Sequence, residues 1–220
     1  MKREVIITDD GSTTIRIPEW DENYHSTHGA IQEAKHVFIK NGLDLFKEHE
    51  AVVILEIGFG TGLNAFITFL ETIDKQRIEY VGVEAYPVAA EEILQMNYVS
   101  ELQANQYQDV FNKMHSCDWE EQQIISNNFY LTKRKQFFQE IQDDGLYDLV
   151  YFDAFGFRVQ PELWTEEVFA TMYKAMKPGG VLVTYACRSV IKNAMLAVGF
   201  KVEKLPGAPG KREMLRAFKL

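Results

Sequence analysis

Residues 52–64 read V-V-I-L-E-I-G-F-G-T-G-L-N, and this stretch decides the fold. It begins as an apolar run broken only by Glu56, which is the pattern of a strand buried inside a parallel sheet. Gly58, Gly60 and Gly62 follow, and an apolar helical pattern begins directly after them. Glycine permits a tight turn and lets the backbone approach a ligand that a Cβ atom would exclude. This order of strand, glycine turn and helix predicts an α/β fold that binds a nucleotide-like ligand at the turn.

Strand and helix patterns alternate along the rest of the chain. We expect strands at 51–57, 80–83, 128–131, 149–152 and 181–185, and helices at 63–72, 87–96, 98–126, 161–176 and 189–198. The segments 200–205 and 214–218 flank the sequence P-G-A-P-G and predict a closing antiparallel hairpin. The βαβα succession implies a doubly wound, mostly parallel sheet with helices on both faces and this hairpin at one edge.

The first fifty residues have a different pattern. Two β-branched runs within 4–17 flank D-D-G-S, and Asp-Gly is a strong signal for a β-hairpin. A helical stretch follows at 30–40. We therefore divide the chain into an N-terminal hairpin-and-helix extension, residues 1–50, and an α/β domain, residues 51–220.

Composition limits the classes of protein to consider. The chain has 220 residues, 46% of them hydrophobic and 25% charged, which is typical of a globular protein with a substantial core. No stretch approaches the roughly 20 apolar residues of a membrane span, and the N-terminus lacks the pattern of a secretory signal. Two cysteines offer no disulfide framework, and the five histidines show no metal-ligand spacing, so we expect a cytoplasmic protein without a metal. The net charge of −9 argues against indiscriminate nucleic-acid binding but allows a local basic patch.

The glycine spacing indicates which ligand is bound. It is G-x-G-x-G, not the G-x-G-x-x-G of dinucleotide sites, and no Gly-Lys-Ser/Thr of a P-loop follows. Glu56, two residues before Gly58, repels a pyrophosphate but suits a cationic ligand such as S-adenosyl-L-methionine. Glu84 ends the second strand, where an acid accepts hydrogen bonds from ribose hydroxyls. The pattern E-x-G-x-G-x-G resembles motif I of the Rossmann-like class I methyltransferases.

Asp153 ends the fourth strand of the expected sheet, in Y-F-D-A-F-G-F. In a doubly wound sheet the ligand lies beyond the carboxyl ends of the strands, so Asp153 is expected to share a cleft with the glycine turn and Glu84. Phe155 and Phe157 flank the loop, and aromatic rings beside a carboxylate suit a base that is stacked and held by its edge. The alternative is that Asp153 caps the following helix.

Four segments together resemble one family, the methyltransferase half of the bifunctional tRNA 5-methylaminomethyl-2-thiouridine biosynthesis proteins of the MnmC type. They are Y-H-S-T-H-G-A-I-Q-E-A-K-H-V-F at 24–38, I-L-E-I-G-F-G-T-G-L-N at 54–64, F-D-A-F at 152–155 with P-E-L-W at 161–164, and G-K-R-E-M-L at 210–215. The resemblance implies methyl transfer from S-adenosyl-L-methionine to an aminomethyl group on a tRNA wobble uridine. The chain ends at Leu220, so we expect a stand-alone methyltransferase whose substrate a separate enzyme supplies.

This resemblance assigns expected roles to the candidate residues. For the cofactor these are Glu56, Gly58, Phe59, Gly60, Gly62, Asn64, Glu84 and Asp153; for the tRNA substrate they are Phe155, Phe157, Arg158, Lys211 and Arg212. The last three form the expected positive patch for the phosphate backbone. Asp153 is expected to be catalytic, since it can orient the substrate amine and take its proton. Two alternatives remain open: an aminopropyltransferase on the same fold, and a catalytically silent subunit that binds the cofactor.

Overall fold

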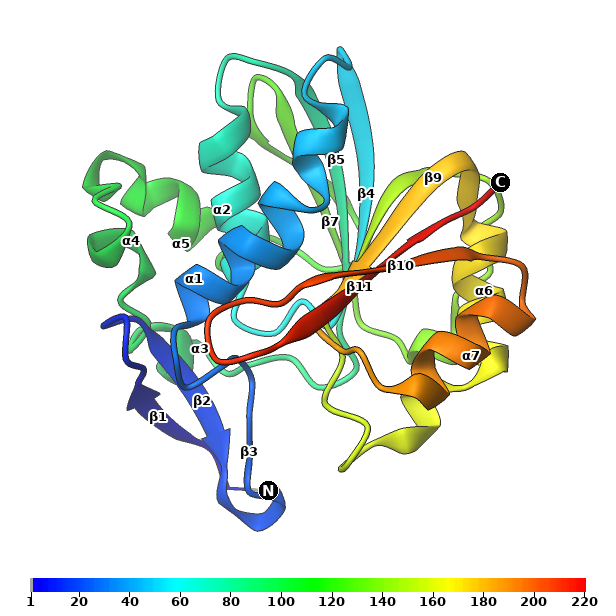
Figure 1. Cartoon of the computed structure of the whole chain (residues 1–220). Helices are drawn as coiled ribbons and strands as arrows, with labels where there is room; N and C mark the ends of the chain where they lie inside the picture. The colour runs from blue at the N-terminus through cyan, green and yellow to red at the C-terminus, as the bar shows by residue number, and fades with distance from the viewer. Residues whose placement is uncertain (1) are drawn as a thin grey trace.

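A mostly parallel β-sheet runs through the centre of the computed structural model, which describes residues 2–220 (Figure 1). Within those residues the sheet has eight strands in the order β10-β11-β9-β8-β4-β5-β7-β6. Their bounds are β4 Ala51–Ile57, β5 Arg77–Val83, β6 Gln122–Ser126, β7 Phe129–Arg134, β8 Tyr147–Phe152, β9 Met176–Thr184, β10 Lys201–Pro206 and β11 Glu213–Phe218. The pairs from β9 to β7 are parallel, while β6, β10 and β11 pair antiparallel at the two edges. The structure confirms the expected doubly wound sheet with its closing hairpin.

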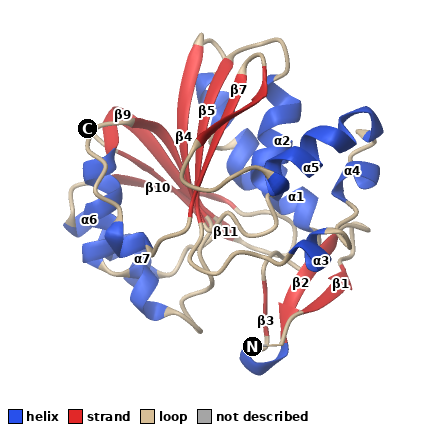
Figure 2. Cartoon of the chain, turned by 180° about the vertical axis from the view of Figure 1, so that it is seen from behind, coloured by secondary structure: helices blue, strands red, loops and turns tan. Residues whose placement is uncertain are grey.

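Helices cover both faces of this sheet (Figure 2). On one face lie α1 Ala30–Ala34, α2 Leu63–Thr72, α4 Tyr98–Glu101 and α5 Gln108–Ser116, and on the other α6 Glu166–Ala175 and α7 Ser189–Ala197. The short helix α3, Ala90–Ile93, lies in the connection after β5. Single turns or short helical segments are η1 Pro18–Trp20, η2 Lys35–Lys40, η3 Leu43–Phe46, η4 Asn105–Tyr107, η5 Phe138–Glu140 and η6 Pro161–Trp164. Apolar side chains from each set of helices pack on the strands as two hydrophobic clusters.

The N-terminal segment forms a second, small sheet of β1 Glu4–Ile7, β2 Thr13–Ile17 and β3 Glu22–Asn23. The first two strands make the expected hairpin, and α1 continues directly into the π-helix η2, as the helical pattern predicts. Val37 and Phe38 are buried in the same cluster as the strand residues of the central sheet, and the ring of Phe38 lies 5.0 Å from that of Tyr151. This packing fixes the N-terminal segment beside the carboxyl ends of the central strands.

Three expected helices need correction. Residues 98–126 are not one helix: they form α4, η4 and α5 and then strand β6, because Ile124 and Ile125 alternate between exposed and buried as an edge strand requires. The expected helix at 87–96 is the single turn α3. The expected helix at 161–176 is interrupted at Thr165, whose hydroxyl accepts a hydrogen bond from Val168 N and so starts α6 anew.

Within residues 2–220, none of the helices combines the length and the apolar character that crossing a bilayer requires. The same stretch of chain contains no group of three or more histidine, cysteine, aspartate or glutamate side chains placed to hold a metal ion.

Candidate active site

A pocket of about 1000 Å³ opens where β4, β5 and β8 end. The loops that follow these strands carry Gly58, Glu84 and Asp153 to its wall. The N-terminal segment closes the opposite side through residues such as Tyr24. The structure therefore brings together residues from three strand ends that sequence reasoning places in one cleft.

Gly58 and Gly60 of the glycine turn line the pocket, whereas Gly62 lies against the ring of His115. Gly58, Gly60 and Gly62 have φ values of +89°, +48° and +68°, in the left-handed region that glycine adopts readily. A Cβ atom at Gly58 would lie 2.5 Å from the carbonyl oxygen of Asp153. The turn after β4 is thus in direct contact with the end of β8, and no larger residue fits at this crossing.

Strand β5 supports the turn from the other side. The ring of Phe59 packs over Gly82, where a Cβ atom would lie 2.3 Å from Phe59 Cδ2. Glu84 follows the strand, and its carboxylate accepts hydrogen bonds from Gly60 N at 3.0 Å and Tyr86 N at 2.9 Å. These two bonds hold the partly exposed carboxylate at the pocket wall, where its free lone pairs remain available to a ligand.

Asn64 joins two carboxylates at the base of the pocket. Its Nδ2 donates to Glu56 Oε1 and to Asp153 Oδ2, each at 2.9 Å. Burial raises the pKa of Glu56 well above its usual range. Burial, with the nearby carboxylate of Glu33, also raises the pKa of Asp153 to about 7. A carboxyl with a pKa near neutrality can both hold and release a proton at physiological pH, which is the property of an acid–base group.

Aromatic rings form the outer wall of the pocket. Phe155 packs edge-to-face against Trp20 and Tyr24, with ring centroids 5.6 and 5.0 Å apart. Tyr185 lines the same wall, and its hydroxyl donates to Ala154 O at 2.8 Å. Sequence reasoning selected Phe155 but missed Trp20, Tyr24 and Tyr185, although Tyr24 begins the first segment of the family resemblance.

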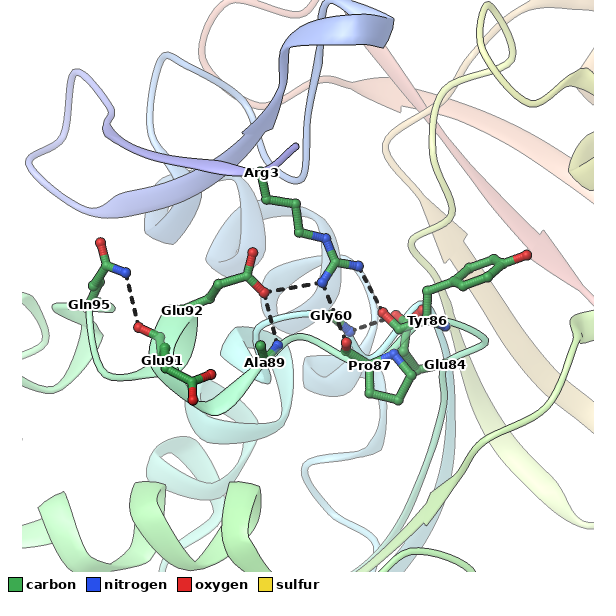
Figure 3. Close-up of polar contacts among 9 residues, drawn as sticks. All are labelled: Arg3, Gly60, Glu84, Tyr86, Pro87, Ala89, Glu91, Glu92 and Gln95. Atoms are coloured by element: carbon green, nitrogen blue, oxygen red, sulfur yellow. Dashed lines mark hydrogen bonds and ion pairs between the residues drawn. The ribbon is translucent and has the colours of Figure 1, made fainter. Parts of the chain in front are cut away.

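Arg3 connects the N-terminal strand to the loop that carries Glu84 (Figure 3). Its guanidinium donates to Tyr86 O at 3.0 Å and Pro87 O at 3.4 Å, and it pairs with Glu92 at 3.1 Å. The side chain also lines the pocket. Arg3 therefore fixes the rim beside Glu84, a role that no local sequence pattern revealed.

Two of the three basic residues that were expected to form a positive patch are paired with acidic residues. Arg158 donates to Trp20 O and Asp21 O and pairs with Glu22 at 3.2 Å. These partners lie more than 130 positions away in the sequence, so the pairing was not visible there.

The charge of Lys211 is also compensated, because its ammonium pairs with the buried carboxylate of Glu33. Arg212 is exposed on the same turn. Phe157 turns toward α7, where it lines a separate shallow hollow and the guanidinium of Arg188 lies 5.0 Å over its ring.

The pocket fits a ligand of the S-adenosyl-L-methionine type. Gly58 and Gly60 of the glycine turn line the pocket, and Glu84 lies beside them, where an acid accepts hydrogen bonds from ribose hydroxyls. Among the residues that the structure describes, Asn64 lines the pocket and its buried Oδ1 lacks a hydrogen-bond partner. Glu56 lies behind Asn64, does not line the pocket, and interacts with the Tyr80 hydroxyl. An acceptor such as Asn64 Oδ1 suits a cationic or amino group.

The chain belongs to the S-adenosyl-L-methionine-dependent methyltransferases, because the sequence profile of a family with that description matches residues 95–220. Among curated relatives, it is 33% identical over 213 residues to the tRNA 5-methylaminomethyl-2-thiouridine biosynthesis bifunctional protein MnmC of Leptospira interrogans, covering 90% of this chain and 32% of that protein. The protein of the same name from Leptospira borgpetersenii is 30% identical over 217 residues, covering 89% of this chain and 32% of that one. The chain thus spans about a third of the length of these relatives.

Solved structures support the same assignment. The crystal structure of MNMC2 from Aquifex aeolicus is similar with a TM-score of 0.76 and 25% identity, over 99% of this chain and 70% of that one. Spermidine synthase from Thermotoga maritima is similar with a TM-score of 0.54 and 15% identity, over 98% of this chain and 72% of that one. At that identity the likeness to spermidine synthase shows the fold alone. The fold is that of the Rossmann-like methyltransferases.

Proposed function

We propose that this chain transfers a methyl group from S-adenosyl-L-methionine to the aminomethyl nitrogen of a modified wobble uridine in tRNA. The observation that carries the proposal is the position of Asp153, which lies between the glycine turn and the aromatic wall of Phe155 and Tyr24. The substrate class comes from the names of the curated relatives.

On the cofactor side, the backbone of the glycine turn and the carboxylates around it would bind the ligand. The turn of Gly58, Gly60 and Gly62 would wrap the ligand, and Glu84 would accept bonds from its ribose hydroxyls. Glu56, which lies behind Asn64, would act on the cationic methionine end through Asn64. Bound S-adenosyl-L-methionine supplies a methyl group on a sulfonium, which a neutral amine can attack.

On the substrate side, Asp153 would bind the charged amine and accept its proton. A primary alkylamine is protonated at neutral pH, and only its neutral form has a lone pair for the attack. The ionised carboxylate binds the ammonium, accepts its proton and directs the lone pair toward the methyl carbon. Phe155 and Tyr24 provide apolar area for the uracil ring, which must leave its stack to reach the pocket. Beyond this, the protein would hold the two bound reactants in the geometry that methyl transfer requires.

The division of the chain follows from this proposal. Residues 51–220 form the methyltransferase domain, and the extension of residues 1–50 contributes Arg3 and the Trp20 and Tyr24 rings of the aromatic wall. A separate enzyme would supply the aminomethyl-uridine. We place the reaction in the cytoplasm, where a tRNA substrate is available.

Nucleoside mass spectrometry of bulk tRNA tests the proposal. Cells that lose this chain should lose methylaminomethyl-uridine and accumulate its aminomethyl precursor, and wild-type protein but not Asp153→Asn should restore the product. An unchanged nucleoside profile in the deletion strain would contradict the proposal. Putrescine with decarboxylated cofactor should give no spermidine; formation of spermidine would favour the aminopropyltransferase. Tight cofactor binding without turnover of any RNA would favour a silent subunit.

A further inference from the structure

Two segments that the cofactor site leaves unexplained meet beside the pocket. They are helix α1 with η2, near the N-terminus, and the turn between β10 and β11, near the C-terminus (Figure 1). His36 Nε2 lies 2.8 Å from Pro206 O, and Lys211 forms an ion pair with Glu33. The last contact joins residues 178 positions apart.

The carboxylate of this ion pair is buried, whereas the Lys211 side chain is 31% exposed. Glu33 is 6% exposed, and its second oxygen accepts a hydrogen bond from Ser26 N at 2.8 Å. Lys211 Nζ lies 4.0 Å from the centre of the Tyr185 ring, a cation–π distance. Burial of the Glu33 carboxylate carries a desolvation cost that the ion pair must offset, so such a pair is weak evidence of a role in stability alone.

Through Tyr185 the pair is connected to the backbone next to the catalytic carboxyl. The Tyr185 hydroxyl donates to Ala154 O, the carbonyl directly after Asp153. Both charges also act on Asp153 through space: the carboxylate of Glu33 raises its pKa, and the ammonium of Lys211 lowers it.

Six groups from the elements around Asp153 interact with it, Asn64 through a hydrogen bond and the others electrostatically. They are Glu56 of β4, Tyr80 of β5, Asn64 of α2, Tyr185 after β9, Glu33 of α1 and Lys211 of the β10–β11 turn. His25 also lies near Glu33, but burial lowers its pKa to about 4, so it stays neutral across the neutral range. Of these groups, Glu33 and Lys211 are the pair whose charges oppose each other at Asp153.

We propose that Glu33 and Lys211 are a positioning pair that sets the electrostatic field at Asp153 and holds Tyr185 against the pocket. The catalytic role of Asp153 in this inference rests on the proposed function. Lys211 then acts within the protein, through Asp153, and not as a contact to the phosphate backbone. Glu33 and Lys211 have opposite electrostatic effects on Asp153. A contact that served only packing would not have such opposite effects.

Titration of the Asp153 carboxyl by ¹³C NMR tests this directly and needs no tRNA. The protein is labelled at the aspartate carboxyl carbon, and the Asp153 signal is assigned by its loss in Asp153→Asn. In Glu33→Gln the midpoint should fall, because an unpaired ammonium remains; in Lys211→Met it should rise, because an unpaired carboxylate remains. Each shift should be roughly half a pH unit or more, and the double variant should return toward the wild-type midpoint.

Controls separate this outcome from misfolding and from failure of the proposed function. Lys204→Met removes an exposed ion pair with Glu213 in the same hairpin and should leave the midpoint unchanged. If Lys211→Met fails to fold, Glu33→Gln and the double variant still decide the matter.

If the titration midpoint of Asp153 moves in the same direction in both single variants, or moves in neither, the proposed role of the pair is wrong. If tRNA methylation is found, the acid limb of the pH profile of kcat/KM should move with the midpoints. If it is absent, the proposed function fails while the titration still tests the pair.

Discussion

Replacement of Asp153 by asparagine should damage turnover far more than cofactor affinity. Asparagine keeps the size of the side chain and an oxygen that can accept the bond from Asn64 Nδ2, so the base of the pocket should stay intact. It loses the charge that holds the ammonium and accepts the proton. General-base assistance contributes about 10²- to 10⁴-fold, so kcat should fall by that order with near-normal cofactor binding.

The pKa of Asp153 determines in which direction activity should change with pH. With the pKa of Asp153 raised to about 7, roughly a tenth of the wild-type enzyme carries the carboxylate at pH 6 and roughly nine-tenths at pH 8. Activity should therefore rise through neutrality as the carboxyl loses its proton. The asparagine variant should lack this ionisation but recover partly at high pH, where solvent supplies more neutral amine.

Transfer of a radiolabelled methyl group from S-adenosyl-L-methionine to undermodified tRNA, measured across pH 6 to 9, provides the assay, with calorimetry for cofactor affinity. Wild-type rates for the asparagine variant across neutral pH would refute the reasoning. Asp153 would then serve only as an acceptor of the Asn64 hydrogen bond, since the helices that follow it are capped by Gln160 and Thr165.

Three further predictions concern the cofactor side. Glu84→Ala should weaken cofactor binding at least about tenfold by calorimetry, because hydrogen bonds to a charged acceptor contribute about 1.5–3 kcal/mol each; unchanged affinity would place the ribose elsewhere. Gly58→Ala should abolish measurable binding and lower Tm, since the new Cβ would lie 2.5 Å from Asp153 O at a φ of +89°; a variant that binds normally would show that the turn is not in contact with the ligand. Arg3→Ala should raise Kd several-fold by freeing the loop that carries Glu84, whereas Arg16→Ala, at an exposed ion pair of the same small sheet, should not; equal effects of the two changes would refute the role of Arg3.

The central strand and its glycine turn could be predicted because their signals are local. Burial on both faces of β4 gives a continuous apolar run, and the positive φ values of the turn require glycine. The shared location of Glu84 and Asp153 could also be predicted, since parallel strands end at the same edge of a sheet. Strand β6 was missed because the edge position allows a polar sequence with one buried face, which resembles an irregular helix.

Long-range pairing could not be predicted. Lys211 looked like a free cation because its partner Glu33 is distant in the sequence, and the ion pair of Arg158 with Glu22 could not be predicted for the same reason. The expected contact of Asn64 with the cofactor stays a prediction, but the two hydrogen bonds that Asn64 donates to carboxylates could not be predicted from the sequence. Such contacts depend on how the extension packs on the sheet, and this packing leaves no periodic signal in the sequence.

The most direct test of the account is reconstitution with purified components. The chain is incubated with S-adenosyl-L-methionine and tRNA that carries aminomethyl-uridine at the wobble position, and the nucleosides are analysed by mass spectrometry. We expect the aminomethyl-uridine to gain one methyl group, dependent on Asp153, while tRNA without the aminomethyl group stays unmodified. Unchanged aminomethyl-uridine, in the presence of demonstrated cofactor binding, would contradict the account.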